Sequence, residues 1–182
     1  MSTPEASAAA PLRFALIGLP GSGKSTVGRQ LSRRLQLPFV DSDQVLEQRL
    51  GASIRDFFAS NGESRFRDLE EQVIDELTRT HQGILATGGG VVLRAANREH
   101  LHQRSHVIYL RSMPEEIYRR LRHDQIRPLL QVEDPMQRLR ELHAVRDPLY
   151  LETAHFVIET GRPSLATLVN MIVMQLELAG LA

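Results

Sequence analysis

The stretch Gly18-Leu19-Pro20-Gly21-Ser22-Gly23-Lys24-Ser25 fits the pattern G-x-x-x-x-G-K-[S/T] at every specified position. The apolar run 14–17 before it suits a buried strand, and Val27, Leu31 and Leu35 after it recur at helical spacing. Glycines let successive backbone N–H groups turn towards phosphate oxygens, and the positive end of the following helix dipole adds to the attraction. The stretch therefore predicts a nucleotide phosphate site. A glycine-rich turn that matches by chance is the weaker alternative.

Two side chains of this stretch have predicted roles. Lys24 is expected to reach the β- and γ-phosphates, and Ser25 is expected to bind Mg²⁺. Lys24 is the only lysine among the 22 basic residues of the chain, and a compact, flexible ammonium suits this position better than a planar guanidinium. The predicted nucleotide contacts of the stretch are Gly21, Ser22, Gly23, Lys24, Ser25 and Thr26.

Composition limits the classes of protein to consider. The length of 182 residues predicts a single domain, over 12–182. Residues 1–11 have neither a basic start nor a long apolar centre, and we expect them to form a disordered tail. Its formal net charge is zero, so we expect neither a nucleic-acid nor a membrane partner. The absence of cysteine excludes disulfides and thiolate metal sites. We expect a cytoplasmic monomer.

Short apolar runs alternate with amphipathic segments, which predicts an α/β fold with a parallel sheet. Two regions do not follow this alternation: 43–80 is too long for one crossover helix, and 122–133 is polar and aperiodic. Insertions of this kind usually serve the substrate. The expected strands are 13–18, 38–41, 83–87, 105–110 and 155–159.

A P-loop protein usually has an aspartate at the end of a second buried strand, where it helps to hold Mg²⁺. Here the strand that includes Thr87 ends instead in Gly88-Gly89-Gly90. The best replacement is Asp41-Ser42-Asp43, from an adjacent strand, with Asp41 directed to the metal's water shell and Asp43 to a substrate hydroxyl. Two alternatives stay open, namely that an aspartate only caps the following helix and that the glycines form a plain turn.

Three arginines are candidates for binding anionic groups. Arg67 and Glu70 are spaced i, i+3, so Glu70 could orient the guanidinium, although a surface ion pair is the alternative. Arg127 lies in the aperiodic insert, where a lid could bring it to the transferred phosphoryl group. Arg146 precedes Pro148, which is expected to kink or end a helix.

These motifs together resemble those of the shikimate kinase family, a branch of the nucleoside monophosphate kinase-like P-loop proteins. The resemblance runs from Arg13 to about Arg162. It implies a five-stranded parallel sheet flanked by helices, a substrate-binding segment at about 43–73 and a lid at about 122–133. It also implies that ATP, with Mg²⁺, phosphorylates the 3-hydroxyl of shikimate. The matching motifs are Gly18 to Ser25, Asp41-Ser42-Asp43, Gly62-Glu63 with Phe66-Arg67 and Glu70, Gly88-Gly89-Gly90, Arg127-Pro128-Leu129-Leu130, and Arg146 with Pro148-Leu149-Tyr150.

The resemblance also implies a role for individual residues. Lys24, Asp43 and Arg127 are the implied catalytic residues, and Ser25 and Asp41 the implied metal ligands, with Asp41 acting through water. The implied nucleotide contacts outside the first stretch are Arg120, Arg127 and Arg162. The implied substrate contacts are Asp43, Arg67, Gly88, Gly89, Gly90 and Arg146.

Two other functions remain to be weighed. A kinase of another small hydroxy acid, such as gluconate, would share the fold. A nucleotide-dependent switch such as a GTPase is disfavoured, because an N-K-x-D motif needs a lysine other than Lys24 and no D-x-x-G occurs.

Overall fold

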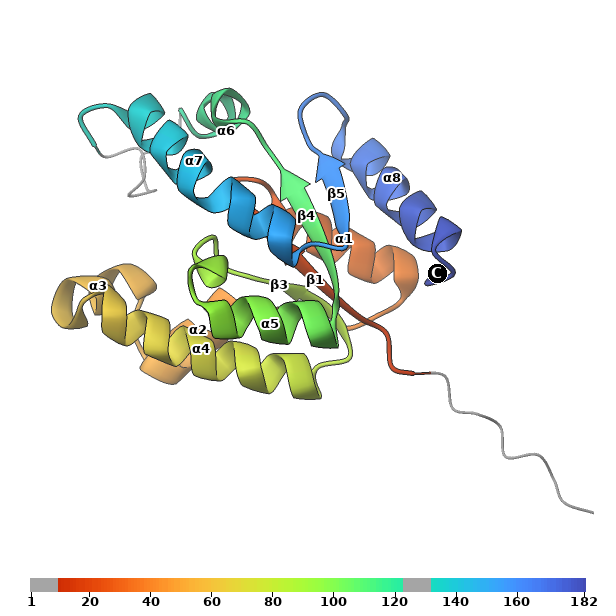
Figure 1. The fold of residues 1–182 in the computed structure, drawn as a ribbon, viewed down its shortest axis with the longest axis horizontal. Helices are drawn as coiled ribbons and strands as arrows, with labels where there is room; N and C mark the ends of the chain where they lie inside the picture. Colours follow the sequence, from red (N-terminus) through yellow and green to blue (C-terminus); the bar gives the residue numbers. More distant parts are fainter. Residues whose placement is uncertain (1–9, 123–131) are drawn as a thin grey trace, which may run out of the picture.

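The computed structural model describes residues 10–122 and 132–182. Its centre is a five-stranded sheet in the order β2-β3-β1-β4-β5, in which every neighbouring pair is parallel (Figure 1). The strands are β1 (Arg13–Ile17), β2 (Phe39–Asp41), β3 (Gly83–Ala86), β4 (His106–Arg111) and β5 (Phe156–Glu159). Each expected strand differs from the observed one by at most one residue at either end. The predicted α/β fold with a parallel sheet is confirmed.

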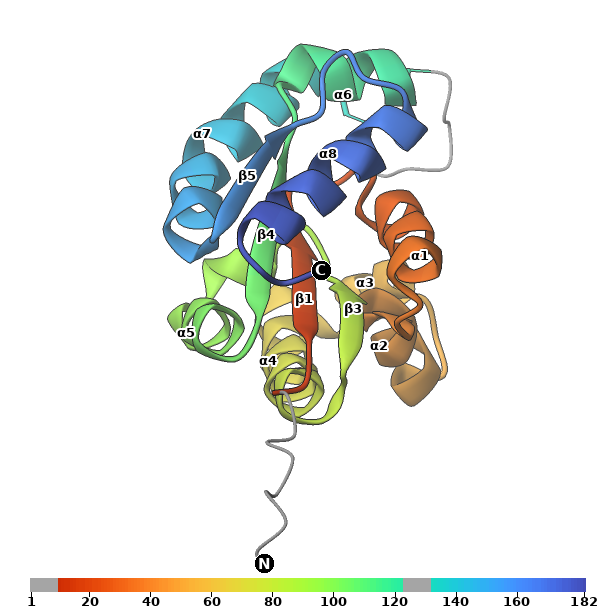
Figure 2. The same ribbon diagram turned by 90° about the vertical axis from the view of Figure 1, so that its right-hand side faces the viewer.

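Helices cover both faces of the sheet, because side chains of a strand point alternately to its two sides. Phe14 and Leu16 of β1 pack with α1 and α8, whereas Ala15 and Ile17 face the core formed with α2, α4, α5, α6 and α7. Figure 2 shows α1 and α8 on one side of the sheet and α5 and α7 on the other. The helices are α1 (Lys24–Leu35), α2 (Ser42–Leu50), α3 (Ile54–Asn61), α4 (Glu63–Thr80), α5 (Ala95–Arg104), α6 (Pro114–Leu121), α7 (Pro135–Thr153) and α8 (Leu165–Leu178), with a 3₁₀ turn, η1 (Val91–Leu93). Within the described ranges, no helix is long and apolar enough to cross a bilayer.

The long segment between β2 and β3 contains α2, α3 and α4 in place of one crossover helix. Helix α3 has no buried residue and lies at one end of the molecule (Figure 1). The predicted substrate-binding segment, 43–73, therefore corresponds to most of α2, all of α3 and the first part of α4. The predicted lid, 122–133, falls almost entirely on residues 123–131, outside the described ranges, and so does Arg127.

The expectation that Asp41 comes from a strand adjacent to that of the phosphate loop is wrong, because β3 lies between β1 and β2. Helix α1 bridges the gap by packing across β3 onto β2. Gly28 makes this approach possible, since a Cβ at this position would lie 2.6 Å from the ring of Phe39. Ser25 at the start of α1 thereby comes within reach of Asp41.

Helix α7 does not end at Pro148 but continues to Thr153. Its last turn is held by Tyr150, which is fully buried and whose ring centroid lies 4.9 Å from that of Tyr109 on β4. Pro148 has no N–H group, so one backbone hydrogen bond of the helix is missing. Burial of a large aromatic side chain stabilises the helix by more than the loss of that bond costs.

Candidate active site

The phosphate loop is shaped by its glycines. Gly18 has φ +154°, and a Cβ there would lie 2.7 Å from the carbonyl oxygen of Leu110. Gly23 adopts a left-handed conformation with φ 93° and forms the N-cap of α1. Lys24 is buried, and its Nζ donates to the carbonyl oxygens of Gly18 at 2.8 Å and Leu19 at 2.9 Å. The loop thus places an ammonium group and a helix N-terminus at one spot, which is a binding arrangement for phosphate.

Asp41 links the phosphate loop to α2. One of its carboxylate oxygens, Oδ2, accepts a hydrogen bond of 2.6 Å from the hydroxyl of Ser25. The other, Oδ1, accepts from the backbone N–H groups of Asp43 at 2.9 Å and Gln44 at 3.4 Å and so caps α2. The capping alternative is therefore correct for Asp41 but incomplete, because a single carboxylate does both. Hydroxyl and carboxylate oxygens are the donors that Mg²⁺ prefers, so Ser25 and Asp41 fit a magnesium site.

Of the acidic side chains near the phosphate loop, Asp43 has the pKa that departs most from its ordinary value. Burial raises the pKa of Asp43 to about 6, and the negative charges of Asp41 and Glu70 add to the rise, whereas Lys24 opposes it. Gly88 allows this close packing, because a Cβ there would lie 2.7 Å from Asp43 Oδ1 and 3.2 Å from Glu70 Oε2. A carboxylate with this pKa can accept a proton near neutral pH, as a general base must.

Arg67 is held in one orientation by a buried partner. Its Nη1 donates to Glu70 Oε1 at 2.9 Å, and the Glu70 side chain is 1% exposed. Burial raises the pKa of Glu70, and the neighbouring Arg67 charge lowers it. The interpretation as a surface ion pair is therefore wrong. Gly90 packs directly on the guanidinium, and a Cβ at this position would overlap it.

Arg146 approaches the same carboxylate from α7. Its positive charge acts on Glu70 and on Tyr150, and it is only half-buried. Arg67 from α4 and Arg146 from α7 thus supply two positive charges around Glu70. Glu70 is the buried carboxylate between them, whereas the second partner of Arg67, Glu63 at 3.3 Å, is 60% exposed and screened by water, so the two guanidinium groups can still bind an anionic group.

A cavity of about 430 Å³ joins the phosphate loop, Asp41 and Asp43 to the start of the glycine turn, whereas Arg67, Gly90 and Arg146 do not line it. A Cβ on Gly89 would lie 2.5 Å from Pro20, so the glycine turn packs against the phosphate loop. The cavity therefore has phosphate-binding groups on one side and a raised-pKa carboxylate on the other. Its lining includes Lys24, Ser25, Thr26, Asp41, Asp43, Gly88, Gly89 and Arg120.

The two remaining predicted nucleotide contacts lie in different surroundings. Arg120 on α6 donates to the carbonyl oxygens of Ser22 at 3.4 Å and Thr160 at 3.1 Å, between the phosphate loop and the segment before α8. A second cavity, of about 270 Å³, lies there and is lined by Arg120 and Pro163. Arg162 is exposed and lines neither cavity.

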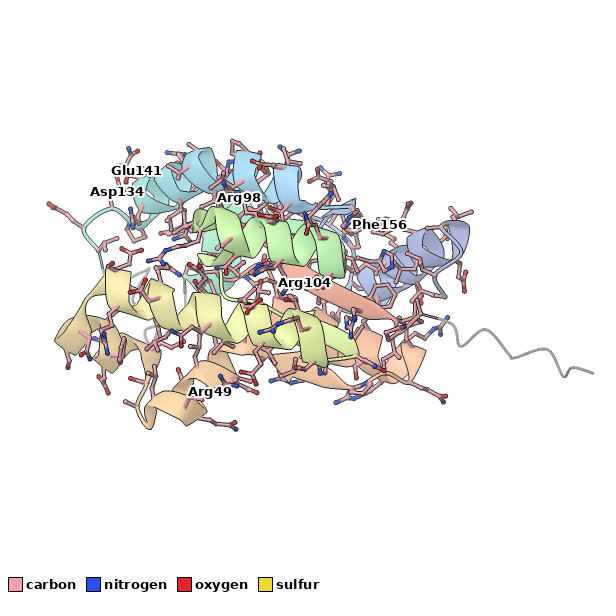
Figure 3. The ribbon with its side chains drawn as sticks, turned by 60° about the horizontal axis from the view of Figure 1, so that its bottom comes forward. Arg49, Arg98, Arg104, Asp134, Glu141 and Phe156 are labelled. Carbon is pink, nitrogen blue, oxygen red and sulfur yellow. The ribbon has the colours of Figure 1, made fainter. Side chains whose placement is uncertain are left out.

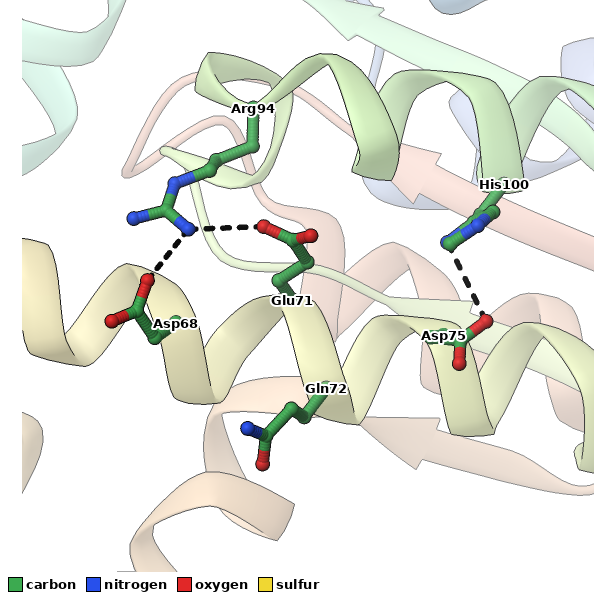
Figure 4. A pocket seen from close by; sticks show the side chains of 6 residues that line it. All are labelled: Asp68, Glu71, Gln72, Asp75, Arg94 and His100. Carbon is green, nitrogen blue, oxygen red and sulfur yellow. Dashed lines mark hydrogen bonds and ion pairs between the residues drawn. The ribbon is translucent and has the colours of Figure 1, made fainter.

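Ion pairs fix the segment that follows the glycine turn. Arg94 Nη1 contacts Asp68 Oδ1 at 2.7 Å and Glu71 Oε2 at 3.0 Å, so α5 is tied to α4 close to Arg67 (Figure 4). Farther along, Arg104, which Figure 3 labels on α5, pairs with Asp75 of α4 at 2.8 Å. These ion pairs therefore hold the segment after the glycine turn against the helix that carries Arg67.

Comparison with known proteins identifies the family. A model of the shikimate kinase family matches residues 20–177. The chain belongs to the shikimate kinase family. It is 62% identical to the shikimate kinase of Paracidovorax citrulli over 93% of this chain and 94% of that one. Membership makes the protein an ATP-dependent kinase, and the expected fold class, enzyme class and family are confirmed.

Solved structures agree with this family. The shikimate kinase of Acinetobacter baumannii in complex with shikimate is similar with a TM-score of 0.87 and 45% identity, over 94% of this chain and 95% of that one. A gluconokinase from Sinorhizobium meliloti has a TM-score of 0.56 and 18% identity, over 92% of each chain. At 18% identity, the similarity to the gluconokinase shows only that the two chains share a fold.

Two contacts in this candidate site could not be predicted from the sequence. Thr87 donates from its hydroxyl to Leu16 O at 2.9 Å, which fixes the start of the glycine turn on β1. Tyr150 donates to the carbonyl oxygen of Gly89. Tyr150 belongs to the motif Arg146 with Pro148-Leu149-Tyr150, but nothing in that motif indicates that its hydroxyl reaches a turn 61 residues away.

Proposed function

We propose that this protein transfers the γ-phosphate of ATP to the 3-hydroxyl of shikimate, giving shikimate 3-phosphate and ADP. The observation that supports this most strongly is the position of Asp43. Its carboxylate has a pKa raised to about 6 and shares a cavity with Lys24 of the phosphate loop. Next to it, Arg67 and Arg146 supply the positive charge that a carboxylate substrate needs.

On the nucleotide side, the phosphate loop and Lys24 hold the phosphates through backbone N–H groups and the ammonium charge. Ser25 and Asp41 would hold Mg²⁺. When bound, the ion neutralises charge on the phosphate oxygens. Arg120 flanks the loop, and the second cavity beside it has room for part of the nucleoside. Positioning and charge neutralisation supply most of what phosphoryl transfer requires.

On the acceptor side, Arg67 and Arg146 bind the carboxylate of shikimate, together with backbone N–H groups of the glycine turn. Asp43 accepts a hydrogen bond from the 3-hydroxyl and takes its proton as the new O–P bond forms. The bond between the γ-phosphorus and the bridging oxygen breaks, and ADP leaves with that electron pair. Because its pKa is raised to about 6, Asp43 is ionised at neutral pH and still binds a proton strongly enough to act as the base.

The test is ADP release in a coupled assay with ATP and Mg²⁺, using shikimate and gluconate as separate acceptors. We expect turnover with shikimate and none above background with gluconate, because gluconate lacks a ring that presents one hydroxyl to Asp43. Absence of shikimate-dependent ADP release would overturn the proposal. Turnover with gluconate alone would favour the other small-acid kinase.

We also propose that the enzyme works as a monomer in the cytoplasm, with the tail over 1–11 disordered and 12–182 folding as one domain. Sedimentation at assay concentration tests the monomer, since a dimer would double the measured mass.

The kcat/KM for shikimate is expected to fall as pH drops below about 6, approaching a tenfold loss per pH unit, because this parameter reports the free enzyme and protonated Asp43 cannot accept the proton. Initial rates between pH 5 and 8.5 measure this, with circular dichroism at each pH as the control for folding. A flat profile across this range would remove Asp43 from the role of base.

Arg127→Ala is expected to reduce kcat by about 10²-fold, less than the loss of a full arginine finger. Arg127 lies outside the described residues, so this prediction rests on its place in the lid motif. Steady-state kinetics at saturating ATP and shikimate measure it, with exposed Arg138→Ala on α7 as the matched control. A near-normal kcat in Arg127→Ala would exclude the residue from the mechanism.

A further inference from the structure

Tyr150 is a buried polar side chain that the chemistry outlined above does not use. It lies in the last turns of α7, is fully buried, and donates from its hydroxyl to the carbonyl oxygen of Gly89 at 2.5 Å. Burial raises the pKa of Tyr150, and although the charges of Arg146 and Arg67 lower it, burial dominates. The phenol therefore stays protonated and remains a donor at the pH values of an assay.

This hydrogen bond fixes the orientation of one peptide unit. In a planar trans peptide, the carbonyl and the following N–H point in opposite directions. Because the Gly89 carbonyl points to α7, the N–H of Gly90 points away from it. Within 10–122 and 132–182, the N–H groups of Gly89 and Gly90 donate to no protein acceptor. Gly90 also packs on the guanidinium of Arg67, so backbone and side-chain donors come together there.

The same tyrosine connects this turn to Arg146. Tyr150 and Arg146 are four residues apart on α7 and therefore lie on one face of the helix. That part of α7 is fixed to β4 by a second set of contacts. The hydroxyl of Tyr109 donates to Asp147 Oδ1 at 2.6 Å, and Arg111 donates to both oxygens of Asp147 at 3.0 Å. The part of α7 that carries Tyr150 is thus anchored to β4.

We propose that Tyr150 is a positioning residue for the acceptor substrate. Its hydroxyl fixes the glycine turn to α7, so that the N–H of Gly90 and the guanidinium of Arg146 meet the carboxylate of shikimate in one arrangement. The inference rests on the proposed function and extends it, because it assigns substrate positioning to a residue that does not itself touch the substrate. Loss of the hydroxyl frees the Gly89–Gly90 peptide to rotate and weakens shikimate binding.

Tyr150→Phe tests this, because it removes the hydroxyl and keeps the ring that packs on Tyr109. We expect the KM for shikimate to rise about tenfold, which is the effect of one lost buried hydrogen bond. The KM for ATP should stay within about twofold of the wild-type value, and kcat within about threefold. Lys24 is held by the carbonyl oxygens of Gly18 and Leu19, and Asp43 packs on Gly88, whereas the bond from Tyr150 fixes the Gly89–Gly90 peptide. Tyr118→Phe, on the exposed side of α6, is the matched control and should change none of these parameters.

A purely structural role would lower the melting temperature without separating the two KM values. A shikimate KM within twofold of the wild-type value, or an equal rise in both KM values, overturns the inference. A second measurement does not depend on turnover. The amide ¹⁵N resonance of Gly90 should shift in Tyr150→Phe, and its response to added shikimate should shrink; an unchanged resonance and response contradict the inference. If the wild-type protein does not phosphorylate shikimate, the proposed function itself is wrong. The outcomes above compare Tyr150→Phe with an active wild-type enzyme and therefore test the role of Tyr150 alone.

Discussion

Asp43→Asn is expected to lower kcat by about 10²- to 10⁴-fold, the usual contribution of a general base. The amide still accepts a hydrogen bond from the 3-hydroxyl but cannot take its proton. The KM for ATP should change little, because Lys24 and the phosphate loop remain in place. Steady-state kinetics at pH 8 measure this, and Asp56→Asn, exposed on α3, is the control. A kcat within threefold of the wild-type value would show that Asp43 is not the base.

The same variant is expected to be more stable than the wild type at pH 8. The folded protein holds a proton on Asp43 more tightly than the unfolded chain does, so ionisation of this group costs stability as pH rises from about 3.8 through about 6. A pKa raised from 3.8 to about 6 corresponds to a cost of up to about 3 kcal/mol above pH 6. Urea unfolding at pH 8 and pH 5 measures the gain, which should shrink at pH 5. Lower stability at pH 8 would contradict this account of the site.

Arg67→Ala is expected to lower kcat/KM for shikimate by about 10²- to 10³-fold, the range for truncating one member of a buried charge pair. The KM for ATP should be nearly unchanged, because Arg67 contacts Glu70 and the glycine turn and does not line the phosphate loop. Arg65→Ala is the matched control, since Arg65 is exposed on the same helix. Equal losses for ATP and shikimate would contradict the assigned role.

The Arg67 variant leaves Glu70 buried without its partner, which could lower stability and obscure the result. The double variant Arg67→Met with Glu70→Gln avoids this, because it removes both charges and keeps their volumes. It should unfold at a urea concentration close to that of the wild type and still show the loss in kcat/KM for shikimate. A double variant that regains shikimate use would assign the effect of the single variant to misfolding.

Local geometry explains which parts of the fold and site could be predicted from the sequence. The phosphate loop depends on glycines at Gly18 and Gly23 with positive φ, and these are set within eight residues of chain. The strands follow from short apolar runs, and their ends coincide with the predicted ones to within one residue. The Arg67–Glu70 pair is likewise a contact within one helical turn.

The parts that sequence reasoning missed depend on contacts between distant segments. The insertion of β3 between β1 and β2 places Asp41 two strands from the phosphate loop. Asp41 still contacts Ser25, because α1 approaches β2 closely where Gly28 packs against Phe39. The burial of Glu70 involves the glycine turn, where a Cβ on Gly88 would lie 3.2 Å from Glu70 Oε2, and no spacing within α4 reveals this contact. The hydrogen bond from Tyr150 to Gly89 joins residues 61 positions apart, and a contact of this kind produces no periodic pattern in the sequence.

The central claim is that Asp43 presents the 3-hydroxyl of shikimate to the γ-phosphate of ATP. It is tested most directly by identifying the product of a reaction with ATP, Mg²⁺ and shikimate by ³¹P–¹H correlation NMR. We predict a single phosphate ester whose phosphorus couples to the proton on carbon 3 of the ring. A phosphate on another hydroxyl, or ATP hydrolysis without any phosphorylated shikimate, would contradict the account.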